Sequence, residues 1–252
     1  MPGLPKTIDE VISQLDQIIQ DCIAANDPKA YFGFLYRRVT AEIRDCLGTG
    51  VFEDDSRMER FDVDFANRYL DAYFRLQAGQ PISQAWKVAF DATDQSYLIL
   101  QHLLLGMNAH INLDLGIAAA DTMIGRSLAD LESDYKVVND ILQRISDDIQ
   151  EKLGRVSPLL FLADKWAGGS DEFLIDKAIR ASRGLAWKLA CTLENLQGSE
   201  REAAIRLADQ QVYKLAKAIL SPIGPWFQGF LNIVRFFETS SVQKALTRLQ
   251  SD

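Results

Sequence analysis

The 252-residue sequence predicts an all-α protein made of a single compact domain, residues 1–252. Apolar residues recur three and four positions apart along most of the chain, which is the period of an amphipathic helix. No alternating apolar and polar run is bounded by hairpin turns, so strands are not expected. The segment 101–115 is apolar on every side, which predicts one fully buried helix at the centre of the domain.

Five helices are expected in the N-terminal half of the chain. Thr7 and Glu10 form a capping box that begins the first of them. Pro28 stands at a first-turn position of the second, and Ser56 is placed to cap the third. The expected spans are about 7–25, 28–48, 56–78, 81–90 and 95–115.

Beyond Gly116 the pattern weakens through Ala118–Gly125, where we expect a kink or a break. Ser127 or Ser133 then caps a helix that runs to about Leu153. A second capping box, Ser199 with Glu202, is expected to begin a helix that ends before Pro222. The remaining expected spans are about 158–169, 170–198 and an aromatic-rich segment that Pro225 opens.

Composition excludes several classes of protein. With 48% hydrophobic and 25% charged residues, the chain is neither disordered nor of low complexity, and no unbroken apolar stretch is as long as a membrane span. The N-terminus has no basic start followed by an apolar core, so we expect a cytoplasmic location. The net charge of −8 argues against a nucleic-acid partner. Three cysteines without metal-ligand spacing are expected to be reduced.

Two segments resemble the signatures of a bacterial and fungal family known only as a domain of unknown function. They are Arg57–Ala72 (RMERFDVDFANRYLDA) and Gln101–Asp114 (QHLLLGMNAHINLD). The resemblance extends over most of the chain and implies one all-helical domain. It implies no activity, because the family has none established.

Five polar residues interrupt the central apolar helix. A polar group buried without a hydrogen-bond partner costs roughly 2–7 kcal/mol, so these residues must form either a structural network or a site. They are His102, Asn108, His110, Asn112 and Asp114.

His110 and Asp114 are one helical turn apart, so their side chains can meet, and an imidazole oriented by a carboxylate can act as a general acid or base. A site for one divalent metal ion would need a third ligand from another helix, most plausibly Asp62. His102 is a poor co-ligand of His110, since eight residues of helix separate the two by about 12 Å.

The helix expected over 56–78 supplies the facing residues. Asp62 lies on its apolar face and needs a partner, and Asn67 lies at the border of that face. We therefore expect this helix to pack on the central one, with Asp62 and Asn67 within reach of His110 and Asp114. Asp64 and Asp71 alternate with arginines and are expected on a solvated, salt-bridged face.

Two functions remain open from the sequence. The first is an enzyme that acts on a small, mainly apolar organic substrate in an internal cavity, by acid–base or metal-assisted chemistry. Its candidate catalytic residues are His110, Asp114, Asp62, Asn67, Asn108 and His102. The alternative is a non-catalytic helical module that binds a ligand or protein through its aromatic C-terminal segment, with the buried polar residues purely structural.

Overall fold

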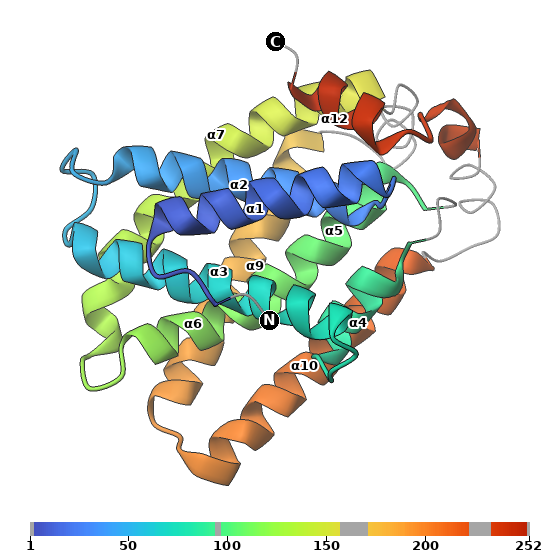
Figure 1. Cartoon of the computed structure of the whole chain (residues 1–252). Helices are drawn as coiled ribbons and strands as arrows, with labels where there is room; N and C mark the ends of the chain where they lie inside the picture. The colour runs from blue at the N-terminus through green and yellow to red at the C-terminus, as the bar shows by residue number, and fades with distance from the viewer. Residues whose placement is uncertain (1–2, 94–96, 157–170, 222–232, 251–252) are drawn as a thin grey trace.

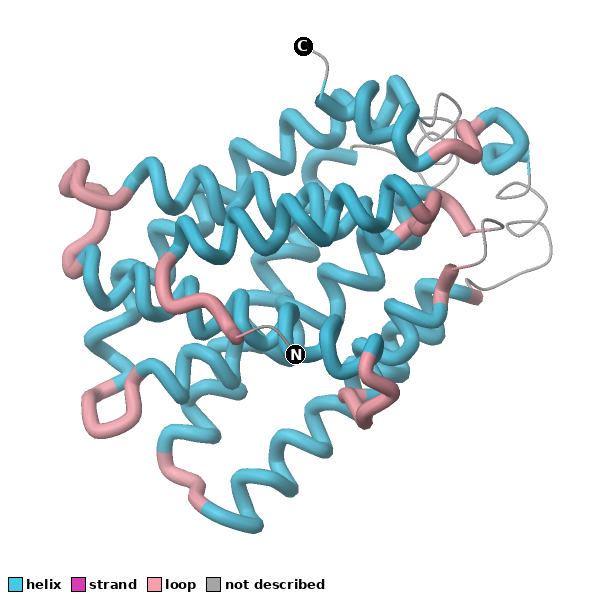
Figure 2. Tube along the Cα trace, in the orientation of Figure 1, coloured by secondary structure: helices cyan, strands magenta, loops and turns pink. Residues whose placement is uncertain are grey.

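The computed structural model describes residues 3–93, 97–156, 171–221 and 233–250. Within these ranges the chain is helical and has no strand, as Figure 2 shows, so the predicted all-α class is confirmed. The elements are α1 (Ile8–Ala24), α2 (Lys29–Cys46), α3 (Asp55–Gln77), α4 (Gln84–Asp91), α5 (Ile99–Ala109), the π-helical turn η1 (His110–Asp114), α6 (Leu115–Thr122), the 3-10 turn η2 (Leu128–Leu131), α7 (Glu132–Val156), α9 (Asp171–Glu194), α10 (Gly198–Leu220) and α12 (Val242–Gln250).

The helices are arranged around α5, η1 and α6, which run end to end through the middle of the molecule (Figure 1). On one side α1 and α2 lie side by side, and α1 also packs on α3. On the other side α9 packs against η1 and α6, and α10 packs against α4 and α5. Because α3 contacts both η1 and α6, the expected packing of this helix on the central one is present.

The central helix is longer than the sequence pattern indicated. It runs from Ile99 to Thr122, and the break expected within Ala118–Gly125 falls at the turn 123–125, where Gly125 has a φ of +79°. By length and mean hydropathy, which is 1.3, this helix could cross a membrane, although the sequence has no unbroken apolar stretch of that length. However, 78% of its most apolar window is buried inside the protein. The small residues after Gly116 continue the helix, and they let neighbouring helices approach closely.

Two glycines of the central helix permit these close approaches. A Cβ atom at Gly106 would lie 2.3 Å from Cγ and 2.7 Å from Cβ of Phe32 on α2. A Cβ atom at Gly116 would lie 2.5 Å from the backbone carbonyl oxygen of Ala186 on α9. The central helix is therefore held between α2 and α9 at distances that no side chain larger than glycine allows.

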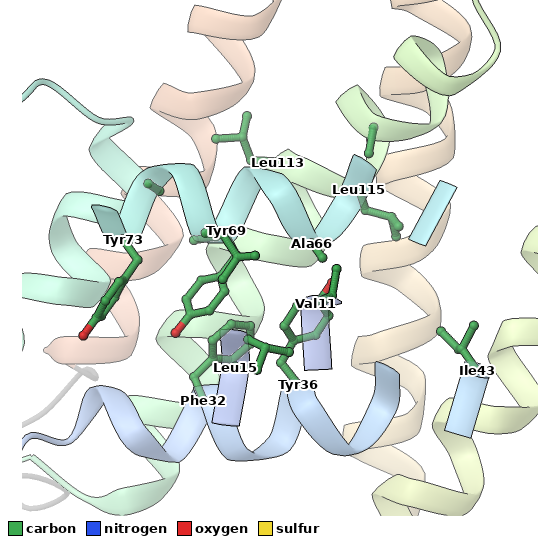
Figure 3. Close-up of a cluster of buried hydrophobic side chains, with 14 of the residues drawn as sticks. Val11, Leu15, Phe32, Tyr36, Ile43, Ala66, Tyr69, Tyr73, Leu113 and Leu115 are labelled. Carbon is green, nitrogen blue, oxygen red and sulfur yellow. The ribbon is translucent and has the colours of Figure 1, made fainter. Parts of the chain in front are cut away.

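One hydrophobic cluster extends through the molecule and includes residues from Ile8 to Leu249. Figure 3 shows the part in which side chains of α2 and α3 meet. The rings of Phe32 and Tyr69 lie edge to face with 5.3 Å between centroids, and Tyr36 meets Tyr69 at 6.0 Å. Aromatic rings thus fill the layer between α2, α3 and the central helix, beside the candidate site.

Several expected helix ends differ from the structure. The N-cap of α3 is Asp54, whose side chain accepts the N–H of Arg57, rather than Ser56. The α10 helix begins at Gly198, so Ser199 lies inside it and does not cap it. The helix expected over 158–169 and most of the segment opened by Pro225 lie outside the described residues.

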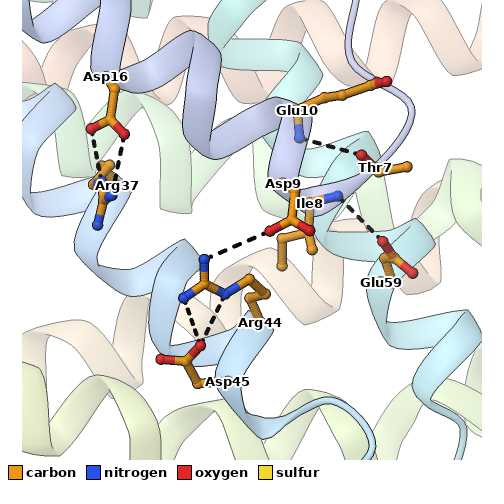
Figure 4. Close-up of polar contacts among 9 residues, drawn as sticks. All are labelled: Thr7, Ile8, Asp9, Glu10, Asp16, Arg37, Arg44, Asp45 and Glu59. Atoms are coloured by element: carbon orange, nitrogen blue, oxygen red, sulfur yellow. Dashed lines mark hydrogen bonds and ion pairs between the residues drawn. The ribbon is translucent and has the colours of Figure 1, made fainter.

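The capping of α1 is a first testable feature. The Thr7 hydroxyl accepts the N–H of Glu10 at 3.2 Å (Figure 4), while the Glu10 carboxylate accepts the N–H of Lys6 at 2.7 Å. Because Thr7→Ala leaves a helix donor without its acceptor, we expect a loss of about 1 kcal/mol in the free energy of unfolding, measured by urea titration. The exposed Ser13→Ala within the same helix serves as control and should leave stability equal or slightly higher. Equal stability of Thr7→Ala and wild type would contradict the capping role.

Candidate functional site

A hydrogen-bonded pair, His110 and Asp114, lies in the π turn of the central helix. Nδ1 of His110 is 3.1 Å from Oδ2 of Asp114, and both side chains are almost fully buried. Burial is the main cause that lowers the pKa of His110, so the imidazole is neutral at neutral pH. Since Nδ1 must then donate its proton to Asp114, Nε2 carries a free lone pair. Nε2 is buried and has no hydrogen-bond partner.

The π turn is defined by a backbone hydrogen bond that spans five residues instead of four. The N–H of Leu115 donates to the carbonyl of His110, five residues earlier, instead of to residue 111. Single π turns inside α-helices are frequent at functional sites. Leu113 in this turn and Leu115 directly after it border different cavities, which are described below.

Trp86 is a second hydrogen-bond partner of Asp114, on the same oxygen as His110. Its indole Nε1 donates to Oδ2 of Asp114 at 2.8 Å. The α4 helix that carries Trp86 is anchored by Asp209 of α10, whose carboxylate accepts the N–H groups of Gln84 and Ala85 at 2.8 and 2.9 Å. A buried carboxylate at a helix N-terminus is electrostatically favourable, so α10 fixes the position of α4 and with it the indole.

His110 faces an apolar cavity of about 70 Å³, which we call the inner cavity. Such a volume is several times the roughly 10–15 Å³ that one water needs. The imidazole stacks on Phe65 at 3.6 Å and meets the edge of Tyr36 at 4.4 Å between ring centroids. The wall is formed by Phe32, Leu35, Tyr36, Val39, Ile43, Met58, Phe61, Asp62, Phe65, Met107, His110, Ile111, Leu115, Val138, Leu142, Ile145 and Arg183.

Asp62 lies on the wall of the inner cavity as a buried acid. It is 2% exposed, and its Oδ2 has no hydrogen-bond partner. Burial, and to a lesser degree the charge of Glu59, raises the pKa of Asp62 to about 7. Asp62 can therefore exist in both protonation states near neutral pH.

Tyr36 brings a further polar atom to the inner cavity. Its hydroxyl is buried and has no hydrogen-bond partner. Burial, and next the charge of Asp62, raises the pKa of Tyr36 well above its usual value. The phenol is thus a neutral group that stays protonated close to Asp62.

Arg183, on α9, is the polar residue of the inner cavity that sequence reasoning missed. Its Nε donates to Oδ1 of Asn139, its Nη2 donates to the carbonyl of Tyr135, and its guanidinium lies 4.2 Å from the ring centroid of Tyr135. Arg183 is 4% exposed, and burial lowers its pKa. Among the described residues it has no carboxylate partner, which is unusual for a buried cation.

Asp114 faces a second and larger space of about 560 Å³, which we call the outer cleft. It lies between α3, α4, the central helix and α10. The charged residues on its wall are Asp64, Arg68, Asp71, Arg75, Asp114 and Asp121. The other residues on its wall are Leu4, Asn67, Ala72, Ile82, Ser83, Trp86, Leu113, Ile117 and Ile205.

The four residues expected to converge meet as two pairs. Asp62 and His110 line the inner cavity, whereas Asn67 and Asp114 line the outer cleft. Asn67 donates from Nδ2 to the carbonyl of Pro5 at 2.9 Å, which fixes its amide. The His110–Asp114 hydrogen bond therefore joins two separate spaces, and the single convergent site expected from the sequence is not formed.

Two other candidate residues lie away from both spaces. Asn108 donates to the carbonyl of Val212 at 2.9 Å and accepts from Asn112 at 2.9 Å, so it ties the central helix to α10. His102 packs against Tyr31 and Tyr97, with ring centroids 5.9 and 6.2 Å away. Neither residue borders the inner cavity or the outer cleft.

The metal site considered from the sequence is not assembled. Among the residues that the structure describes, no three His, Cys, Asp or Glu side chains lie close enough together to hold a metal ion. The three ligands considered, His110, Asp114 and Asp62, do not form such a group, and Asp62 and Asp114 border different spaces.

The charged face of α3 borders the outer cleft. Asp71 pairs with Arg75 at 3.5 Å, as the alternating charges indicated, but Asp64 accepts the hydroxyl of Thr122 at 2.7 Å instead of pairing with an arginine. Both aspartates lie on the wall of the outer cleft. Asp64, Asn67 and Asp71 are spaced three and four positions apart, and this spacing indicates that they share one face of α3.

The fold and the site define a helical protein with a buried histidine–aspartate pair between two cavities. The chain belongs to DUF5995, a family of unknown function, whose model matches residues 8–222. No curated protein and no solved structure matches the chain.

Proposed function

We propose that the protein is an acid–base enzyme that acts on a small, mainly apolar organic molecule in the inner cavity. The observation that carries the proposal is the neutral His110, whose Nδ1 is held by Asp114 while Nε2 has no partner in an apolar cavity. This arrangement is that of a general base whose tautomer is fixed by a carboxylate.

Each polar group on the wall has a role in proton transfer. Nε2 of His110 accepts a proton from the substrate, and Asp114 stabilises the imidazolium that results. Asp62, with a pKa of about 7, can return a proton to the substrate from the same cavity. The neutral hydroxyl of Tyr36 can donate a hydrogen bond to an oxygen on which negative charge develops.

Arg183 suggests that the substrate carries an anionic group. It is a buried cation whose described partners are all neutral, and it lies on the wall of the inner cavity. A guanidinium binds a carboxylate well because its N–H donors match the two oxygens. A small apolar carboxylic acid would therefore fit both the apolar wall and the cation.

The buried groups without partners favour a site over a structural network. Oδ2 of Asp62, Nε2 of His110 and the hydroxyl of Tyr36 each lack a hydrogen bond. Each such group costs about 1–3 kcal/mol, whereas a network serving stability would satisfy its members. Asn108, whose Nδ2 donates to Val212 and whose Oδ1 accepts from Asn112, shows how this helix satisfies a structural residue.

The second candidate function is the non-catalytic binding module. Large apolar side chains are exposed near the C-terminus, with Phe236 at 81%, Phe237 at 56% and Ile233 at 56%. Such a patch is typical of a surface that contacts a partner. If this second function is correct, the inner cavity would bind a ligand without catalysing a reaction.

The experiment that separates the two functions is deuterium exchange into small carboxylic acids, ketones and aldehydes in D2O, followed by proton NMR. We expect the wild type to accelerate exchange of a C–H proton next to a carbonyl in members of this panel. His110→Gln should slow that exchange about 100-fold or more, because the base is removed.

His102→Gln is the matched control, since His102 and His110 are the two histidines of the chain and His102 lies away from both cavities. It should exchange protons at the wild-type rate. Circular dichroism verifies that both variants are folded. Absence of exchange by the wild type, or exchange unaffected by His110→Gln, would contradict the enzyme proposal.

A further inference from the structure

Apart from Asp114, the residues of the outer cleft have no part in the proposed proton transfer, yet the cleft has the size of a ligand site. Its volume of about 560 Å³ compares with about 70 Å³ for the inner cavity. Sites for small organic molecules occupy roughly 300–1,000 Å³. The outer cleft can therefore hold a whole small molecule, and its charges indicate which kind.

Each of the two arginines on the wall already has a carboxylate partner. Arg68 forms an ion pair with Asp121, which also pairs with Arg201 of α10. Arg75 pairs with Asp71, one turn earlier on α3. An anionic ligand would have to displace these carboxylates, so the cleft is unsuited to a phosphate or a carboxylate.

Two aspartates on the same wall have no cationic partner among the described residues. Asp64 accepts one hydrogen bond, from the neutral hydroxyl of Thr122. Asp114 accepts bonds from the indole of Trp86 and from neutral His110, and both bonds go to Oδ2. The described chain supplies no donor to Oδ1 of Asp114, a residue that is only 4% exposed.

This charge balance calls for a cation. A buried carboxylate is costly unless it is paired, and a cleft with excess charge of one sign concentrates ligands of the opposite sign. A bare metal ion is a poor match, because no three ligand side chains converge in the described part of the chain. The wall also presents Ile82, Leu113 and Ile117, which suit a hydrocarbon body.

We propose that the outer cleft binds a small organic cation, an amine or a guanidine. Its charged head pairs with Asp114, and its apolar body lies against Ile82, Leu113 and Ile117. The proposal shares Asp114 with the proposed enzyme activity, but it concerns binding in the outer cleft and not proton transfer in the inner cavity.

The test uses three probes of nearly the same shape and different charge: benzylammonium, benzyl alcohol and benzoate. Each is titrated into the full-length protein at neutral pH and low salt, and the indole N–H resonance of Trp86 is followed by ¹H–¹⁵N NMR. Benzylammonium should shift this resonance and bind about tenfold or more tightly than benzyl alcohol, because its head is charged. Benzoate should not bind, and added salt should weaken the binding of benzylammonium.

Asp114→Asn should weaken benzylammonium binding about tenfold, because it removes the charge that pairs with the head. Asp64→Asn, at a partly exposed position that is expected to tolerate the change, should weaken binding by less, because Asp64 bonds Thr122, two turns along the central helix from Asp114. Asp45→Asn is the matched control, because Asp45 pairs with Arg44 on the surface outside the cleft. Benzylammonium affinity should be unchanged in this control.

Equal binding of benzyl alcohol and benzylammonium, preferential binding of benzoate, or no binding of any probe would overturn the proposal. Tyr36→Phe, which alters only the inner cavity, should bind benzylammonium like the wild type. Loss of binding in Tyr36→Phe would also overturn the assignment to the outer cleft. Deuterium exchange measured on the same samples reports separately on the enzyme proposal.

Discussion

Asp62→Asn should stabilise the protein by several kcal/mol at pH 8 and should have little effect at pH 4. Burial raises the pKa of Asp62 from an ordinary value of 3.8 to about 7. The folded protein therefore holds a proton that the unfolded chain releases between about pH 4 and pH 7. This difference in pKa corresponds to roughly 4 kcal/mol.

The sign follows from proton linkage. Below about pH 4 both states carry a protonated Asp62, and the group does not oppose folding. As the pH rises to about 7, the unfolded state gains the free energy of ionisation and the folded state does not, so wild-type stability falls. Asparagine does not titrate, and the variant lacks this loss.

Urea titrations of wild type and Asp62→Asn at pH 4, 6 and 8 measure the difference. Asp45→Asn, an exposed carboxylate in a surface ion pair, provides the control and should change stability by less than about 1 kcal/mol at each pH. Parallel curves for wild type and Asp62→Asn would show that Asp62 is ionised in the folded protein. A variant that gains stability and loses deuterium exchange would fit an acid kept in a costly position for catalysis.

Gly106→Ala should destabilise the protein by about 3 kcal/mol or more. The new methyl group would lie 2.3–2.7 Å from three atoms of Phe32, including Cβ, which cannot move away without the α2 backbone. Overpacking in a tight core costs typically 1–3 kcal/mol, and a clash with atoms next to the backbone lies at the upper end of that range. Thermal and urea unfolding measure the loss.

Gly184→Ala is the matched control for this prediction. Gly184 lies inside α9, and a Cβ atom there would meet nothing within 4 Å. Alanine favours helix over glycine by about 1 kcal/mol, so this variant should be more stable than the wild type. If Gly106→Ala were also stabilising, the close approach of α2 to the central helix would be wrong.

The sequence predicted the all-α class and the buried central helix because both depend on local periodicity. It also singled out Asp62 as a polar residue on an apolar helix face, and Asp62 lies on the wall of the cavity that His110 faces. Arg183 could not be found in this way, because it reaches the inner cavity from α9, far along the chain from α2 and α3. No local pattern distinguishes this arginine from a surface residue.

The division into two cavities was also beyond sequence reasoning. A spacing of four between His110 and Asp114 fits an α-helical turn and a π turn equally well, and the backbone decides between them. Alternating charges on α3 correctly indicated the pair of Asp71 and Arg75, yet the pattern did not reveal that this face borders the outer cleft. Which neighbouring helices cover a polar face is set by tertiary packing.

The π turn acts as one extra residue inserted into an otherwise continuous α-helix. Because the wide turn absorbs this residue, the α-helix resumes beyond it in register, and removal of Asn112 would restore ordinary helical bonding while α6 keeps its orientation. Gly116 would still face α9, whereas His110 and Asp114 would stand three positions apart instead of four. The length of this segment therefore sets the geometry of the histidine–aspartate pair separately from the packing of α6.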